Sequence, residues 1–203
     1  MDRQILKEVL LDQRTLSLKP DDVLRQQSFV EDSEVVVISG VRRCGKSTLL
    51  QEIRSKQNES DYFFNFDDER VLKFTVNDFQ ILTELFIELF GKQNTYYFDE
   101  IQNIEGWERY IRRLRDYGSK VFVTGSNASM LSRELGTHLT GRYVRKELFP
   151  FSFKEFLRLK DVDYPEIGLL STNGKALLKG QFNTYFESGG FPDYLKSGNK
   201  EYL

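Results

Sequence analysis

The stretch Gly40-Val41-Arg42-Arg43-Cys44-Gly45-Lys46-Ser47 matches the pattern G-x-x-x-x-G-K-[ST]. It follows an apolar, β-branched run at 34–39 and precedes a segment with helical spacing at 46–56, so it joins a predicted strand to a predicted helix. The glycines of this pattern allow a tight turn whose N–H groups, with the helix N-terminus, point at phosphate oxygens. We therefore predict a phosphate-binding loop; a glycine-rich turn with a fortuitous lysine is the alternative.

We expect the residues of this loop to have different roles in binding phosphate and Mg²⁺. The candidate phosphate-binding residues are Gly40, Val41, Arg42, Arg43, Cys44, Gly45, Lys46, Ser47 and Thr48. We expect Lys46 to reach the β- and γ-phosphates and the Ser47 hydroxyl to hold Mg²⁺. Arg42 and Arg43 either add positive potential near the phosphates, or face solvent or pair with a carboxylate. Cys44 is predicted to be a small packing residue, the alternative being a thiol made reactive by the helix N-terminus.

An acidic pair ends another predicted strand, at 95–98, which is rich in aromatic residues. Asp99 and Glu100 then lie at the carboxyl end of a parallel strand, the edge at which such sheets bind ligands. We expect Asp99 to hold Mg²⁺ through water and Glu100 to orient and polarise an attacking water. The alternative is an exposed Asp-Glu turn without a catalytic role.

Polar residues at two other strand ends are weaker candidates. Ser126 or, by preference, Asn127 follows the strand at 120–124 and can sense a γ-phosphate while positioning water, or else caps the next helix. Asn65 can restrain Glu100 until a partner arrives, although a simple turn explains it almost as well.

Arginines supply the remaining charged candidates. Arg142 can act as a finger on the phosphate of a neighbouring subunit; an ordinary ion pair is the alternative. Arg133 is a weaker candidate, and His138 is predicted to be structural. Four arginines at 109–115 are interspersed with acidic residues, so we interpret them as a solvated face rather than a nucleic-acid or partner contact.

Apolar strand-like runs alternate with amphipathic segments along the chain, which predicts a parallel α/β sheet. Strands are expected at 34–39, 62–66, 95–98, 120–124 and 143–148; helices are expected at 2–27, at 46–56, from a cap at Thr75 with Asp78, and from Trp107 to Tyr117 before Gly118. In the first helix, Ile5, Val9 and Leu10 are expected to share a face. After Pro150 the pattern is helical only. We divide the chain into an N-terminal helical segment (1–33), an α/β core (34–149) and a small helical unit (150–203).

Composition excludes several classes of protein. The 203 residues are 39% hydrophobic and 30% charged, with a net charge of −2, as expected for a globular chain rather than a disordered or generally DNA-coating one. One Cys and one His exclude an internal disulfide and a Cys/His zinc site. The chain shows no signal peptide pattern and no apolar stretch of membrane-spanning length, so we expect a cytoplasmic protein without a membrane partner.

Further motifs extend the pattern beyond the loop and the acidic pair. They are Phe64-Asn65-Phe66-Asp67-Asp68-Glu69-Arg70, Phe98-Asp99-Glu100-Ile101-Gln102, Val123-Thr124-Gly125-Ser126, Leu139-Thr140-Gly141-Arg142, Leu148-Phe149-Pro150-Phe151-Ser152-Phe153 and Gly189-Gly190-Phe191-Pro192-Asp193-Tyr194-Leu195. With these motifs the chain resembles the AAA-superfamily P-loop ATP-binding proteins of bacteria and archaea, near the archaeal ATPase and STAND branches.

The resemblance implies an ASCE-type P-loop NTPase fold, with a five-stranded parallel sheet of order 5-1-4-3-2 and a small C-terminal helical lid. It also implies that Gly190 and Pro192 pack against the adenine or ribose; a turn between two lid helices is the alternative. Similar proteins continue with further domains, so we expect this chain to be the N-terminal ATPase portion of a longer protein.

These observations together predict an Mg-ATP-binding switch that slowly hydrolyses ATP to ADP and phosphate. Lys46, Glu100, Asn127 and Arg142 are the candidate catalytic residues, Ser47 and Asp99 the magnesium ligands, and Pro192 a nucleotide contact. The alternatives are a nucleotide-gated interaction module with little hydrolysis and a helicase-like, nucleic-acid-stimulated motor fragment. A homo-oligomer, and a protein or nucleic-acid partner bound through a further C-terminal domain, are candidate assemblies. A nucleoside kinase and guanine specificity are disfavoured.

Overall fold

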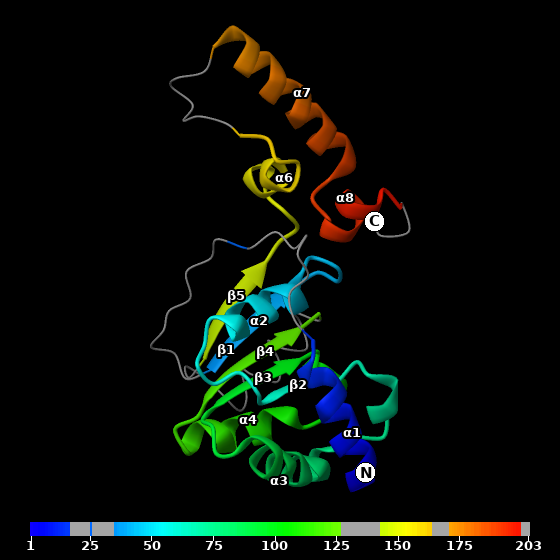
Figure 1. The fold of residues 1–203 in the computed structure, drawn as a ribbon, viewed down its shortest axis with the longest axis vertical. Coiled ribbons are helices and arrows are strands. Elements are labelled where there is room, and N and C mark those ends of the chain that lie inside the picture. The colour runs from blue at the N-terminus through cyan, green and yellow to red at the C-terminus, as the bar shows by residue number, and fades with distance from the viewer. Residues whose placement is uncertain (17–24, 26–34, 127–142, 164–170, 200–203) are drawn as a thin grey trace.

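The computed structural model describes residues 1–16, 25, 35–126, 143–163 and 171–199 (Figure 1). Its centre is a parallel five-stranded sheet. The strands are β1 (Val35–Gly40), β2 (Phe63–Asn65), β3 (Thr95–Asp99), β4 (Lys120–Gly125) and β5 (Val144–Leu148). They lie in the order β2-β3-β4-β1-β5, and each neighbouring pair is parallel. This is the predicted 5-1-4-3-2 order, so the sequence-based fold class is confirmed.

The helices connect the strands in the alternation expected for crossover connections. They are α1 (Arg3–Arg14), α2 (Lys46–Ser55), α3 (Phe79–Phe90), α4 (Trp107–Asp116), α6 (Phe153–Leu159), α7 (Thr172–Ser188) and α8 (Pro192–Ser197). Short 3-10 turns form η1 (Glu69–Val71), η2 (Val76–Asp78) and η3 (Ile101–Asn103). The predicted cap before α3 is present, because both the backbone N–H and the hydroxyl of Thr75 donate to the Asp78 carboxylate.

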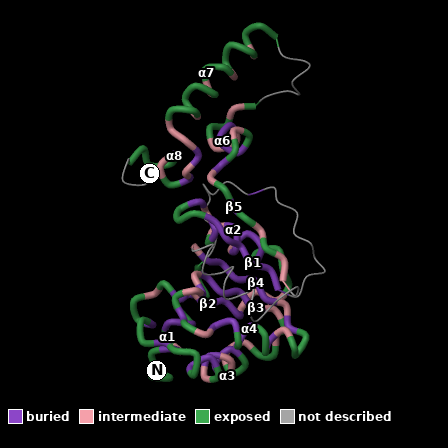
Figure 2. Tube along the Cα trace, turned by 180° about the vertical axis from the view of Figure 1, so that it is seen from behind, coloured by how far each residue is buried: buried purple, intermediate pink, exposed green. Residues whose placement is uncertain are grey.

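Each face of the sheet has its own apolar core, because successive side chains of a strand point to opposite faces. Val35 and Val37 belong to a core that also contains side chains of α1, α3 and α4. Val36 and Ile38 belong to a second core with side chains of α2. The strand residues are therefore buried on both faces, which explains the nearly continuous apolar run in the sequence (Figure 2).

Two details of the helices differ from the sequence-based expectations. The first helix ends at Arg14 rather than near residue 27, and it buries Leu6, Val9 and Leu10 while Ile5 faces solvent. Tyr117 follows the end of α4 and is 80% exposed, although Trp107 and Leu114 are buried as expected. Helical spacing alone does not show which positions of a helix contact the core or where the helix ends.

The three helices that the structure describes after Pro150 share a small core of their own. Phe151, Phe156, Leu157 and Leu195 form this cluster, and Tyr185 packs against it from α7. No residue of α7 is fully buried, and the helix projects away from the sheet (Figures 1 and 2). We refer to α6, α7 and α8 as the C-terminal helices.

The strand register places the functional candidates at one edge of the sheet. Ser39 on β1 lies beside Gly125 on β4, and Phe98 on β3 lies beside Val123 on β4. The carboxyl ends of β1, β3 and β4 therefore meet, so the loop after Gly40, the acidic pair at the end of β3 and Ser126 are neighbours.

Candidate functional site

The loop between β1 and α2 has the tight backbone that its glycines predict. Gly45 caps α2 with φ +94°, a conformation that side chains disfavour. A Cβ on Gly40 would lie 2.2 Å from the carbonyl oxygen of Leu148 on β5, so the loop leaves the sheet in close contact with the neighbouring strand. Lys46 begins α2, is only 4% exposed, and donates to the carbonyl oxygen of Val41 across the loop at 3.2 Å.

Cys44 packs inside this loop as predicted from its size. Its side chain is fully buried in the core on the α2 side of the sheet. Burial raises the pKa of its thiol, while the charges of Lys46 and Arg25 act in the opposite direction. The structure therefore favours the packing interpretation over that of a reactive thiolate.

Asp99 ends β3 as a nearly buried carboxylate beside the start of α2. Hydrogen bonds from the hydroxyls of Thr124 and Ser47 reach it, and burial raises the pKa of this carboxyl against the effect of those bonds. The two candidate magnesium ligands, Ser47 and Asp99, are thus in direct contact. Within the described residues, no group of three or more Cys, His, Asp and Glu side chains gathers into a metal site.

Glu100 follows in the left-handed region, with φ +50°, which is an uncommon conformation for a residue with a side chain. Its backbone N–H donates to the Thr124 hydroxyl at 2.9 Å. Its carboxylate oxygens have two partners: Lys46 Nζ lies 3.6 Å from Oε1, and Gln102 Nε2 donates to Oε2 at 2.5 Å. Such locally strained backbone is frequent at functional sites, where the surrounding contacts fix one side-chain direction.

Gln102 belongs to a quoted sequence motif but was not a candidate site residue, and it is Gln102 rather than Asn65 that contacts the Glu100 carboxylate. The amide of Gln102 also donates to the Ser126 hydroxyl at 3.3 Å, which connects η3 to the end of β4. The amide oxygen of Asn65 instead accepts from the backbone N–H of Asp67 at 2.9 Å. The turn interpretation of Asn65 is the one that the structure favours.

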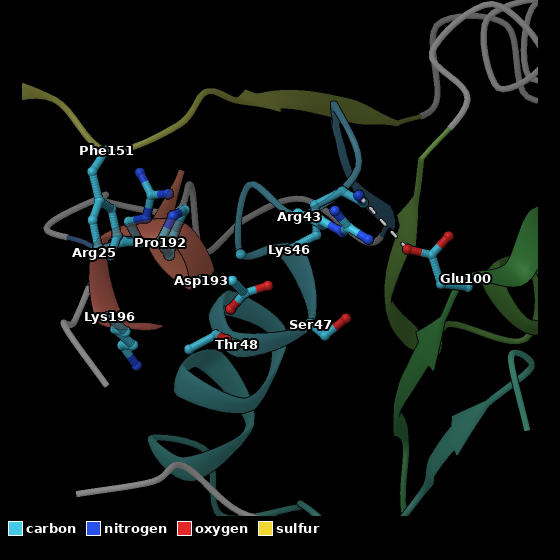
Figure 3. Close-up of a pocket in the computed structure, with 11 residues that line it drawn as sticks. Arg25, Arg43, Lys46, Ser47, Thr48, Glu100, Phe151, Pro192, Asp193 and Lys196 are labelled. Carbon is cyan, nitrogen blue, oxygen red and sulfur yellow. Dashed lines mark ion pairs between the residues drawn. The ribbon is translucent and has the colours of Figure 1, made fainter. Parts of the chain in front are cut away.

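A cavity of about 180 Å³ lies between the loop and the C-terminal helices. Its lining comes from the loop and α2 (Arg43, Gly45, Lys46, Ser47 and Thr48), from Glu100, from Arg25, and from Phe151, Pro192, Asp193 and Lys196 in the C-terminal part of the chain. Figure 3 shows Glu100 facing Lys46 at one end, and Arg25, Phe151 and Pro192 at the other. Residues of the glycine-containing loop and of the acidic pair thus form one end of the cavity, and Pro192 of the Gly-Gly-Phe-Pro motif lies at the opposite end.

Several candidates from the sequence lie elsewhere. Gly40, Val41, Arg42 and Cys44 lie beside the cavity rather than in its lining, and Asp99 lies behind Ser47. Asn127 and Arg142 lie outside the described residues. Sequence reasoning missed Arg25, Asp193 and Lys196. Asp193 follows Pro192 within its motif and Lys196 comes directly after the motif, whereas Arg25 carries no local signal.

The sheet order, the loop after β1 and the acidic pair after β3 define a P-loop NTPase fold of the AAA type. The sequence model of an AAA domain family matches residues 32–157, more than half of the chain. The chain therefore belongs to this AAA domain family.

Relatives of this chain occur in archaea and bacteria. An uncharacterized protein of Methanocaldococcus jannaschii is 35% identical over 196 residues, which cover 95% of this chain and 44% of that protein. An uncharacterized protein of Haemophilus influenzae is 36% identical over 186 residues, which cover 86% of this chain and 44% of its own length. A second M. jannaschii protein is 26% identical over 154 residues. The chain thus spans less than half the length of these relatives. Within the described part of the chain, each helix is too short or too polar to cross a membrane.

Proposed function

We propose that the chain binds Mg-ATP in the cavity between the phosphate loop and the C-terminal helices and hydrolyses it to ADP and phosphate. One observation carries this proposal: Lys46, Ser47, Asp99 and Glu100 meet at a single edge of the sheet. A cation, a hydroxyl and two carboxylates in this arrangement are the groups that phosphoryl transfer to water requires.

The residues would divide the work by their chemistry. The loop N–H groups and Lys46 would neutralise phosphate charge, and Ser47 with Asp99 would hold Mg²⁺. The ion would supply further charge neutralisation on the phosphate oxygens. The contact between Ser47 and Asp99 supports this assignment, because it places the two residues that would hold the ion side by side. Glu100 would accept the proton of the attacking water as a general base.

The C-terminal helices would act as a lid, with Pro192 facing the base or ribose. Pro192 supports this idea because it lines the cavity opposite the loop (Figure 3). Closing such a lid excludes water and commits the nucleotide, and hydrolysis would then change the lid position as a switch.

A second function, a nucleotide-gated interaction module with little hydrolysis, is favoured by one specific contact. Both Lys46 and Gln102 contact the Glu100 carboxylate, so these contacts restrain the direction of the candidate base. A partner that released Glu100 would then be needed for turnover.

A measurement of Mg-ATP turnover per molecule against protein concentration distinguishes the two functions, with Glu100→Gln as the control. Turnover above that of Glu100→Gln supports hydrolysis by this chain, and turnover that rises with concentration indicates sites completed between subunits. Turnover equal to the control, with binding intact, supports the interaction module. Absence of nucleotide binding in the unmodified chain would contradict both.

A further inference from the structure

Arg25 is a buried arginine that joins parts of the chain far apart in sequence. It is 5% exposed and lines the cavity between the loop and α8. One guanidinium nitrogen donates to the carbonyl oxygen of Cys44, inside the phosphate loop, at 2.6 Å. The other lies 3.2 Å from each carboxylate oxygen of Glu155 on α6. A single planar group therefore connects the loop to the first of the C-terminal helices.

The contact with Glu155 holds the start of α6. The same carboxylate accepts from the backbone N–H and the hydroxyl of Ser152, each at 2.8 Å, and so closes the cap of that helix. The Arg25–Glu155 pair is shielded from water, and in such a buried place a charge left without its partner is costly. A movement of Arg25 would therefore tend to carry the first turn of α6 with it.

Phe151 extends this connection to the other two C-terminal helices. The Arg25 guanidinium lies over its ring, 4.4 Å from the centroid. The backbone N–H of Phe151 donates to the carbonyl oxygen of Gly190 at 2.6 Å, just before α8. Its own carbonyl oxygen accepts from the Tyr185 hydroxyl on α7 at 2.7 Å. Arg25 thus contacts the residue on which α7 and α8 converge.

We infer that Arg25 is a positioning residue that transmits nucleotide occupancy of the phosphate loop to the C-terminal helices. This inference rests on the proposed binding of a nucleotide at the loop. Phosphates bound by the loop N–H groups fix the peptide units of the loop, including the carbonyl of Cys44 to which Arg25 donates. Arg25 then fixes Glu155 and Phe151, and with them the start of α6 and the junction of α7 and α8.

Hydrogen exchange of backbone amides, followed by mass spectrometry on the whole chain with and without Mg-ADP, tests this inference. In the unmodified chain we expect Mg-ADP to slow exchange in the loop at 40–48 and also in α6. In Arg25→Met we expect the loop to keep its protection at saturating Mg-ADP, while the nucleotide-dependent protection of α6 is lost. Glu155→Gln, which keeps an acceptor for the cap of α6, should reproduce this separation in weaker form.

Arg54→Met is the matched control. Arg54 is also a buried arginine stacked on a phenylalanine, Phe63, but its hydrogen bonds end on Arg14, Leu16, Gln51 and Ser60, around the far end of α2. Its loss should lower stability and leave the response of α6 to Mg-ADP unchanged. Equal loss in Arg54→Met would overturn the inference, because the effect would then follow from destabilisation alone.

Two further outcomes separate the inference from the function on which it rests. Protection of the loop with an unchanged response of α6 in Arg25→Met overturns the role of Arg25 and leaves nucleotide binding standing. Failure of Mg-ADP and Mg-ATP to protect the loop of the unmodified chain overturns the proposed binding site, and the inference with it.

Discussion

The ammonium nitrogen of Lys46 lies 3.6 Å from a carboxylate oxygen of Glu100. This ion pair spans the cavity end at which phosphates are proposed to bind (Figure 3). A phosphate group and the Glu100 carboxylate would therefore compete for the same cation. Nucleotide binding would weaken the hold on Glu100 and leave Gln102 as its remaining described partner.

Glu100→Gln should keep nucleotide binding and stall hydrolysis. The substitution removes the proton acceptor and also the negative charge that competes for Lys46, so affinity for Mg-ATP should rise while turnover falls by about 10²-fold or more. Calorimetry gives the affinity, and single-turnover phosphate release gives the rate. Normal turnover by Glu100→Gln would show that another group accepts the proton.

Lys46→Ala should abolish Mg-ATP binding. The side chain of Lys46 is buried against the loop, and its removal would leave the phosphate charge without a neutralising cation. Lys56→Ala is the matched control, because the exposed Lys56 lies just past the other end of α2, where it pairs with the buried Glu52. Titration calorimetry should detect binding by the control alone; equal affinities would remove Lys46 from the binding site.

Gly190→Ala should destabilise the chain by about 1–3 kcal/mol, the usual cost of overpacking. A Cβ at this position would lie 2.3 Å from the backbone oxygen of Phe151, so the two segments must separate. Gly180→Ala in α7 meets nothing within 4 Å and should instead add up to about 1 kcal/mol, through better helix propensity. Urea unfolding of the two variants should therefore give changes of opposite sign.

Asp68→Asn should lower stability near neutral pH but not in acid. Hydrogen bonds from Arg70, chiefly from its side chain, lower the pKa of Asp68 from 3.8 to about 2, and Gln13 adds a further bond. A lowered pKa in the folded state stabilises the fold above pH 4, and this contribution disappears as the pH falls towards 2. We expect a loss of about 1–2 kcal/mol at pH 7.

The check on Asp68 is urea unfolding at a series of pH values. The difference between Asp68→Asn and the unmodified chain should shrink steadily below pH 4. Asp67→Asn, a change at the exposed neighbouring carboxylate, should show little effect across the same range. A difference for Asp68→Asn that is independent of pH would indicate lost packing rather than lost charge.

The strands could be predicted because the apolar run that forms each of them is local, whereas their order was implied by the family resemblance. A buried parallel strand needs a continuous apolar run, and Val35–Gly40 supplies one within six residues. The loop geometry follows from glycines at fixed spacing. The end of α1 was missed because periodicity alone does not show where a helix stops contacting the core.

Contacts between distant residues could not be predicted in the same way. Arg25 and Glu155 are 130 positions apart, and no spacing pattern in the sequence links the two. Gln102 was visible within its motif, but its bond to Glu100 depends on the left-handed turn at Glu100, which no neighbouring glycine signals. Side-chain direction at such a turn is a property of the folded chain.

Trp107 gives this site an optical reporter. It is the chain's single tryptophan, it is fully buried, and it begins α4 only four residues after η3, the turn that carries Gln102. Its emission therefore comes from one place, next to the segment whose contacts a bound phosphate would change. A shift in that emission on mixing with Mg-ATP would time the movement of this segment directly, without a label.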